Sequence, residues 1–174
     1  MNKAILSVWK KFQFKHNIKK IRTTIVSYLT DEGIQNEIVE GNIQFTYEDY
    51  KYSVEFRLNE EYPCCYIDFQ LADEDYQKLD LSQKTFIADK VNTDEIRHAV
   101  VKCFNDQVTV DTHFYFTNKD MLLTLFYTYF TDLKSTVDAM LEITIDKIQE
   151  NEGKKPIGFS IPPKDLKAEN AQAI

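Results

Sequence analysis

Apolar and polar residues alternate almost without interruption between residues 42 and 71. Successive side chains of a β-strand point to opposite faces of a sheet, so this alternation predicts strands with one buried face and one polar face. Polar turn residues divide the segment at Glu48-Asp49 and again before Pro63. The segment is therefore predicted to form a three-stranded antiparallel meander.

Three further segments have apolar residues three or four positions apart, which is the spacing of an amphipathic helix. The first spans residues 17–32, where Asn17 can cap the start and Gly33 can end the helix. A second helix is predicted over residues 80–92 and a long third helix over residues 119–150. The apolar stripe of the long helix, which we expect to pack on the sheet, comprises Leu122, Phe126, Tyr129, Leu133, Val137 and Met140.

The second and third helices each begin with polar residues three positions apart. Asp80 with Gln83, and Thr117 with Asp120, resemble capping boxes, in which each side chain bonds a backbone N–H at the helix start. The expected buried positions of the second helix are Phe86, Ile87 and Val91.

Two more strands are predicted at residues 96–104 and 107–116, joined by the turn dipeptide Asn105-Asp106. A hairpin centred on that dipeptide pairs residue i with residue 211 − i, which places His98 opposite His113. The elements then follow the order helix, three strands, helix, two strands and long helix. The predicted fold class is α+β, with a five-stranded antiparallel sheet and helices on one face.

The chain divides into a single α+β domain at residues 17–150 and two terminal segments. Residues 1–16 form a basic arm, and residues 151–174 form a proline-containing tail that we expect to be flexible. Residues 1–22 carry seven Lys and Arg and no acidic residue, whereas the whole chain carries −7, so the remainder carries −14. A basic arm on an acidic body can bind that body, an acidic partner, an anionic membrane surface or nucleic acid.

Several function classes are disfavoured by what the sequence lacks. The signatures of serine hydrolases, zinc proteases, P-loop proteins and EF-hands are missing, so we expect no enzymatic activity and no cofactor. Nucleic-acid binding is not expected, because the body is acidic and the strand motif of RNA-binding sheets is missing. No integral membrane segment or signal peptide is expected, and three cysteines cannot form a closed disulfide set, so a cytoplasmic location is predicted.

The arm and the tail each carry apolar residues suited to binding a protein partner. In the arm, Trp9, Phe12 and Phe14 interleave with lysines, as in segments that bind through both charge and apolar area. In the tail, Ile157, Phe159 and Ile161 alternate like a short strand that adds to a sheet edge.

Two alternatives to a protein-binding role remain open on the sequence. The first is a metal-binding or enzymatic site, in which His98 and His113 face one another on the sheet and Asp111 supplies a third ligand. The second is an adaptor that binds a membrane surface or an acidic partner through the basic arm.

The order of elements resembles that of the YbjN and type III secretion chaperone-like group of domains. The resemblance covers about residues 17–145 and is carried by residues 41–47, 52–56, 87–92, 108–116 and 126–130. It implies the order α-β-β-β-α-β-β-α, and it implies a role in binding other proteins or in regulation, often as a dimer. We therefore predict a non-enzymatic protein-interaction or chaperone-like module with a protein partner, which includes a second copy of the chain.

Overall fold

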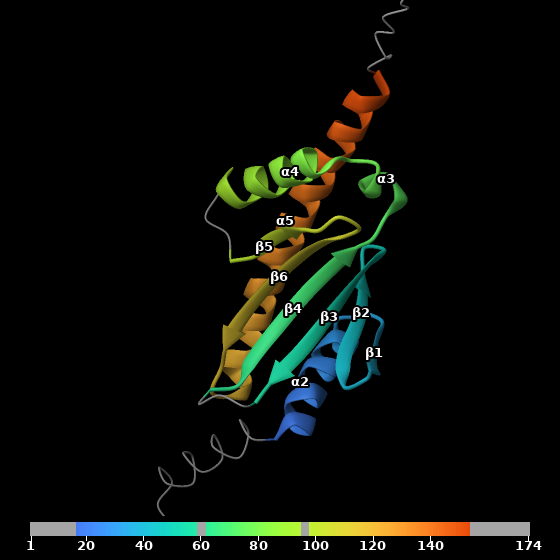
Figure 1. Cartoon of the computed structure of the whole chain (residues 1–174). Helices are drawn as coiled ribbons and strands as arrows, with labels where there is room; N and C mark the ends of the chain where they lie inside the picture. The colour runs from blue at the N-terminus through green and yellow to red at the C-terminus, as the bar shows by residue number, and fades with distance from the viewer. Residues whose placement is uncertain (1–16, 59–61, 95–97, 154–174) are drawn as a thin grey trace, which may run out of the picture.

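The computed structural model describes residues 17–58, 62–94 and 98–153 of the chain. Helices and strands follow the predicted order, with one additional strand after the first described helix and one additional short helix after the meander. Figure 1 shows their arrangement and labels. The elements are α2 (Ile18–Asp31), β1 (Asn36–Val39), β2 (Asn42–Tyr47), β3 (Tyr50–Arg57), β4 (Cys64–Leu71), α3 (Glu74–Gln77), α4 (Leu81–Asp94), β5 (Val100–Cys103), β6 (Val108–Tyr115) and α5 (Lys119–Gly153).

The six strands form one antiparallel sheet in the order β1-β2-β3-β4-β6-β5. Helices α2 and α5 lie on one face of this sheet, and α4 packs on α5 and β5 near one end (Figure 1). The opposite face carries no helix in the described part of the chain. The α+β class, the antiparallel sheet and the one-sided helices are therefore confirmed. The predicted number of strands is wrong, because the short edge strand β1 was missed.

The turns explain how β1 arises. The β1–β2 hairpin turns through Glu40 and Gly41, and the β2–β3 hairpin through Glu48 and Asp49, all with positive φ between 48° and 87°. Two-residue turns with positive φ at both positions match the right-handed twist of paired strands. Gly41 is therefore the sequence signal that indicates a strand before residue 42, since only glycine adopts this backbone conformation at no steric cost.

The core lies between the sheet and the helices α2 and α5 and is rich in aromatic rings. Phe45 and Tyr52 are cross-strand neighbours whose ring centroids stack 5.4 Å apart. Phe130 of α5 meets each of them edge-on at 5.2 Å, and Phe126 stacks on Phe130 at 6.0 Å. The predicted stripe of α5 is buried throughout except for the half-buried Tyr129. Covering the sheet with this stripe therefore removes a large apolar area from water.

The helix starts agree with the prediction at α4 and differ at α5. Asp80 Oδ1 accepts from the backbone N–H of Gln83 at 2.8 Å, and Gln83 Oε1 accepts from the Asp80 N–H at 3.1 Å, which confirms the capping box. The predicted cap of α5 is wrong, because Asn118 and not Thr117 accepts from the Met121 N–H, at 3.0 Å. The Asn118 side-chain oxygen thus satisfies one of the unpaired donors of the first turn.

One predicted core residue of α4 lies at the surface. Phe86 is 48% exposed, while Ile87, Ala88 and Val91 are buried. Adjacent helical residues are about 100° apart around the axis, so a stripe centred on Ile87 and Val91 turns Phe86 away from the core.

The β5–β6 hairpin has the predicted register, but its strands are shorter than expected. Val100 pairs with Asp111 and Cys103 pairs with Val108, as a hairpin centred between Asn105 and Asp106 requires. β5 begins at Val100 rather than at residue 96. The C-terminal helix α5 extends to Gly153, past the boundary predicted at residue 150.

Candidate functional site

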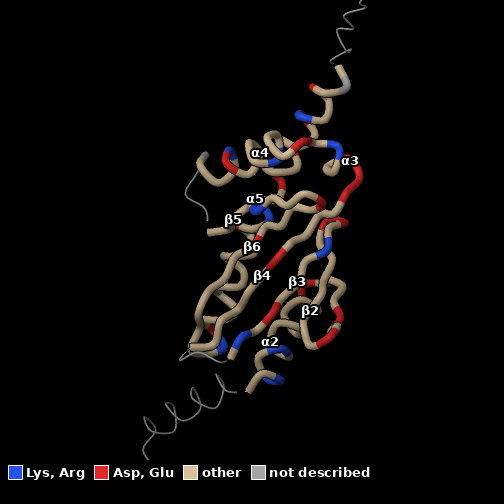
Figure 2. The backbone as a smooth tube through the Cα atoms, in the orientation of Figure 1, with Lys and Arg blue, Asp and Glu red and all other residues tan. Residues whose placement is uncertain are grey.

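The sheet face opposite α2 and α5, called here the open face, presents the polar members of each alternating strand. Acidic residues lie along its central strands (Figure 2). Its described side chains range from half-buried to exposed and include Gln44, Lys51, Ser53, Glu55, Arg57, Tyr66, Asp68, Gln70, Lys102, Asp111, His113 and Tyr115.

A stack of three side chains crosses the open face from β3 to β6, and it is called here the Arg57 stack. The guanidinium carbon of Arg57 lies 3.9 Å from the ring centroid of Tyr66, and the Tyr66 and His113 rings stack 5.2 Å apart. Tyr115 meets His113 edge-on at 6.3 Å and is 44% exposed. The order of the strands brings these residues together, because β4 lies between β3 and β6. Residues that are distant along the chain thus form one partly exposed surface.

Glu55 fixes the orientation of the Arg57 guanidinium. Its two carboxylate oxygens accept from Nε and Nη2 of Arg57 at 3.0 and 3.1 Å. This bidentate contact raises the pKa of Arg57 further above its usual value. Glu55 also lies directly opposite Tyr66 across the β3–β4 pair, so the carboxylate and the ring hold the arginine from two sides. The stack is therefore held in position before any partner binds.

Two carboxylates lie at the centre of the open face. Asp68 of β4 and Asp111 of β6 are directly opposite in the register, and Lys102 of β5 forms an ion pair with Asp111 at 2.5 Å. Burial, followed by the charges of Asp111 and Glu55, raises the pKa of Asp68 above its ordinary value. The carboxylates of Asp68 and Asp111 thus provide negative charge at a partly buried position of the open face.

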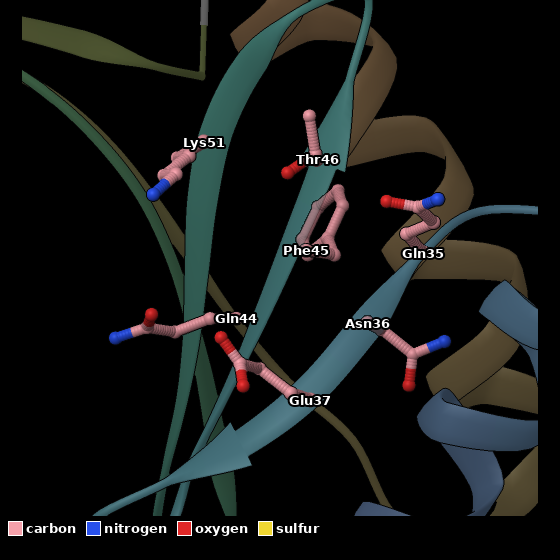
Figure 3. Close-up of a pocket in the computed structure, with 7 residues that line it drawn as sticks. All are labelled: Gln35, Asn36, Glu37, Gln44, Phe45, Thr46 and Lys51. Atoms are coloured by element: carbon pink, nitrogen blue, oxygen red, sulfur yellow. The ribbon is translucent and has the colours of Figure 1, made fainter.

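Two shallow hollows adjoin one another at the β1 side of the sheet and share Gln44 and Lys51. One, of about 250 Å³, is lined mainly by polar side chains: Gln35, Asn36, Glu37, Gln44, Phe45, Thr46 and Lys51 (Figure 3). The other, of about 290 Å³, is lined by Gln44, Lys51, Tyr52, Ser53, Asp68, Gln70 and Ala72. In Figure 3 the Gln44 and Glu37 side chains lie close together on the same side of the strands. Open, polar hollows of this kind differ from the enclosed apolar pockets typical of small-molecule sites.

The structure separates the residues of the proposed metal site. The His98 ring lies against Tyr129 of α5 with centroids 4.8 Å apart, whereas His113 lies on the open face against Tyr66. The expected pairing of His98 with His113 is wrong, although the register of the hairpin is right, because β5 begins only at Val100. Among the described residues, no group of three or more His, Cys, Asp and Glu side chains is arranged to hold a metal ion.

Asp132 of α5 explains why the chain departs from the strand at His98. Its Oδ2 atom accepts from the backbone N–H of His98 at 2.8 Å and of Ala99 at 3.0 Å. The carboxylate thus fastens the chain to the helix just before β5 begins. The adjacent His98 ring is drawn to the helical side of the sheet.

The six apolar residues predicted to bind a partner lie outside the described residues. They are Trp9, Phe12 and Phe14 in the arm and Ile157, Phe159 and Ile161 in the tail. Sequence reasoning missed the Arg57 stack, although strand parity already placed Arg57 and His113 on polar faces. The missing information was the adjacency of β4 and β6.

Comparisons with known proteins place the chain by its fold. No protein-family model matches the sequence, and no curated protein is similar to it. The crystal structure of an uncharacterised protein from Methanothermobacter thermautotrophicus is similar, with a TM-score of 0.50 and 18% identity over 76% of this chain and 99% of that chain. The crystal structure of YbjN from E. coli, a candidate transcription regulator, matches with a TM-score of 0.40 and 9% identity over 74% of this chain and 92% of that chain.

The similarity concerns the arrangement of the elements. The antiparallel sheet with helices on one face agrees with the fold implied by the resemblance to the YbjN and type III secretion chaperone-like group, while β1 and α3 are additional to the implied order. A shared fold does not determine activity. In the described residues, no helix combines the length and the apolar character needed to span a membrane.

Proposed function

We propose that this chain is a non-enzymatic protein-interaction module, chaperone-like or regulatory, which acts in the cytoplasm and binds a protein partner through the open face. The observation that carries the proposal is the Arg57 stack with the exposed Tyr115 beside it. Tyrosine and arginine are enriched among the residues that contribute most to protein–protein affinity. Ordering them in advance reduces the entropy that binding would otherwise cost.

The dimensions of the open face suit a protein. The six strands have between four and eight residues, rise about 3.3 Å per residue and lie about 4.8 Å apart, so the sheet presents roughly 600 Å². A standard protein–protein interface buries about 800 Å² on each partner. Arg57, Tyr66 and Tyr115 are of the residue types that are enriched at protein–protein interfaces. A second copy of the chain is one partner that this proposal includes.

The test is capture of partners by the full-length chain from the cytoplasm of its native cells. The double variant Arg57→Ala/Tyr115→Ala removes exposed parts of the stack, whereas Tyr127→Ala, which removes a 61% exposed tyrosine from α5, is the matched control. We expect a specific protein, or a dimer measured by light scattering, with wild type and with the control but not with the double variant. A strictly monomeric mass without a captured protein, or equal capture by both variants, overturns the proposal.

A further inference from the structure

A second surface lies on the helical side of the molecule, where α2 runs beside the start of α5. A groove of about 530 Å³ separates the two helices there. It is lined by Asn17, Lys19, Lys20, Thr23, Thr24, Ser27, Tyr28, Asp31, Lys119 and Leu123. Since α2 and α5 cover the sheet from the other side, this groove is separate from the open face (Figure 1).

The groove is positively charged for two independent reasons. Its lining contains three lysines, Lys19, Lys20 and Lys119, and one acidic residue, Asp31. Among the described residues, none of the three ammonium groups has an ion-pair partner. Both helices also begin at the same end of the groove (Figure 1). The N-terminus of a helix carries a partial positive charge, so two such ends add to the lysines.

The interior of the groove is less polar than its rim. Tyr28 and Leu123 are half-buried and pack against the core, with the Tyr28 ring edge-on to Phe126 at 5.9 Å. Burial is the largest cause that raises the pKa of the Tyr28 phenol above its ordinary value. The hydroxyls of Thr23 and Thr24 donate to backbone carbonyls within α2, and the lysines are the charged donors of the groove.

The charge distribution of the whole chain indicates which ligand fits. Residues 154–174 carry four lysines and two acidic residues, so the chain's own tail does not complement the groove. Residues 23–174 carry −14, and this field repels large polyanions such as duplex nucleic acid or an anionic bilayer. A short acidic segment contacts the groove alone and avoids most of that repulsion. A concave groove also fits a rod-shaped ligand better than a flat surface.

We propose that this groove binds an acidic amphipathic helix of a partner protein. Its carboxylates would lie over Lys20 and Lys119, and its apolar side chains on Tyr28 and Leu123. The recognition is that of a helix in a groove, with charge selecting the acidic face. With the open face on the other side of the sheet, the chain would hold two partners at once, although the groove does not depend on the open face.

The test uses the full-length chain and a fluorescein-labelled amphipathic helical peptide of glutamate and leucine, with a lysine–leucine peptide of equal length as the ligand control. The variant Lys20→Glu/Lys119→Glu reverses two charges at the rim. It keeps the helices stable, since acidic residues are favourable at helix N-termini. The variant Lys78→Glu/Lys90→Glu makes the same change in net charge at exposed positions outside both the groove and the open face. Circular dichroism is the measurement that checks whether both variants are folded.

Fluorescence anisotropy should show binding of the acidic peptide only, weakened by salt because exposed charges are screened. We expect the groove variant to bind about tenfold more weakly and the control variant to bind as wild type does. Absence of wild-type binding, an equal loss in both variants, or a loss of self-association rather than peptide binding in the groove variant overturns the proposal. So does binding of anionic vesicles or duplex DNA that depends equally on Lys20 and Lys119. The Arg57→Ala/Tyr115→Ala variant should keep full peptide affinity, which distinguishes this inference from the proposed function.

Discussion

Asp68 and Asp111 lie directly opposite one another on the adjacent strands β4 and β6, and both are half-buried. Lys102 pairs with Asp111 on its other side, so the positive charge in this row is closest to only one of the two carboxylates. Like charges opposite one another destabilise a sheet. The chain therefore keeps an unfavourable pair at the centre of its open face, which is consistent with a surface maintained for binding.

We predict that Asp68→Asn stabilises the protein at neutral pH by roughly 0.2–1 kcal/mol, because it removes the repulsion from Asp111 and keeps an oxygen that can accept a hydrogen bond. The pKa of Asp68 is raised above its ordinary value of 3.8. The folded state therefore binds its proton more tightly, and this contribution to stability is present below pH 3.8 and lost as the pH rises through the folded value.

Urea unfolding at several pH values measures this effect. The gain from Asp68→Asn should grow as the pH rises from about 3 to 7 and then stay constant. Glu37→Gln, an exposed carboxyl on the edge strand β1, is the control and should change stability little at any pH. A gain that shrinks as the pH rises would show that repulsion does not govern this pair.

Truncation of Phe126 to Ala should destabilise the protein by about 3–5 kcal/mol, since its ring is fully buried between Tyr28, Phe45 and Phe130. The neighbouring Tyr127 is 61% exposed, and Tyr127→Ala should cost less than about 0.5 kcal/mol. Chemical denaturation of the two variants measures the difference. Similar costs at both positions would place the packing face of α5 elsewhere.

Asn118→Ala should lower stability by about 1 kcal/mol, because the backbone N–H of Met121 loses its acceptor at the start of α5. Thr117→Ala serves as the adjacent control and should cost less than about 0.5 kcal/mol. The same urea titration compares them. The cap assignment fails if the threonine variant is the more damaging one.

Tyr76→Phe should stabilise the protein by about 1 kcal/mol at neutral pH, since the Tyr76 hydroxyl is buried without a hydrogen-bond partner in the described residues. Burial raises its pKa from 10.0 to about 12. Above pH 10 the unfolded chain loses this proton more readily than the folded one, so stability falls as the pH rises towards 12.

Thermal unfolding between pH 9 and pH 12 tests the second part of this prediction. Tyr76→Phe should lose less stability than wild type over that range, while a remaining loss comes from Tyr52, whose pKa is also raised to about 12 by burial. Tyr127→Phe, at an exposed position, should follow the wild-type curve. An alkaline loss unchanged by Tyr76→Phe would contradict the assignment.

Most elements could be predicted from the sequence, because the signals that define them are local. Alternation in β3 and β4, the stripe of α5 and the Asp80–Gln83 box all lie within single segments. The register of the β5–β6 hairpin was predicted for the same reason, since a short turn fixes the pairing on either side of it. β1 was not predicted, because a strand of four residues at a sheet edge is too short to show an alternation of apolar and polar residues.

The candidate site was less predictable. Strand parity placed Arg57 and His113 on polar faces, but parity does not say which strands are neighbours. β6 pairs with β4 across an insertion that contains two helices and β5, and only that pairing stacks His113 on Tyr66. His98 was placed wrongly even though the predicted register of the hairpin is correct. Asp132 of α5 binds the backbone at His98, so this residue lies before the start of the strand.

By itself the sequence determined, with exceptions such as Phe86, which side chains are buried and which face solvent, because hydrophobic periodicity records the faces of each helix and strand. The tertiary structure decided which exposed side chains meet. The Arg57 stack, the Asp68–Asp111 row and the basic groove between α2 and α5 each join residues from elements that are distant along the chain. Such contacts depend on strand order and helix packing, and no local pattern encodes those.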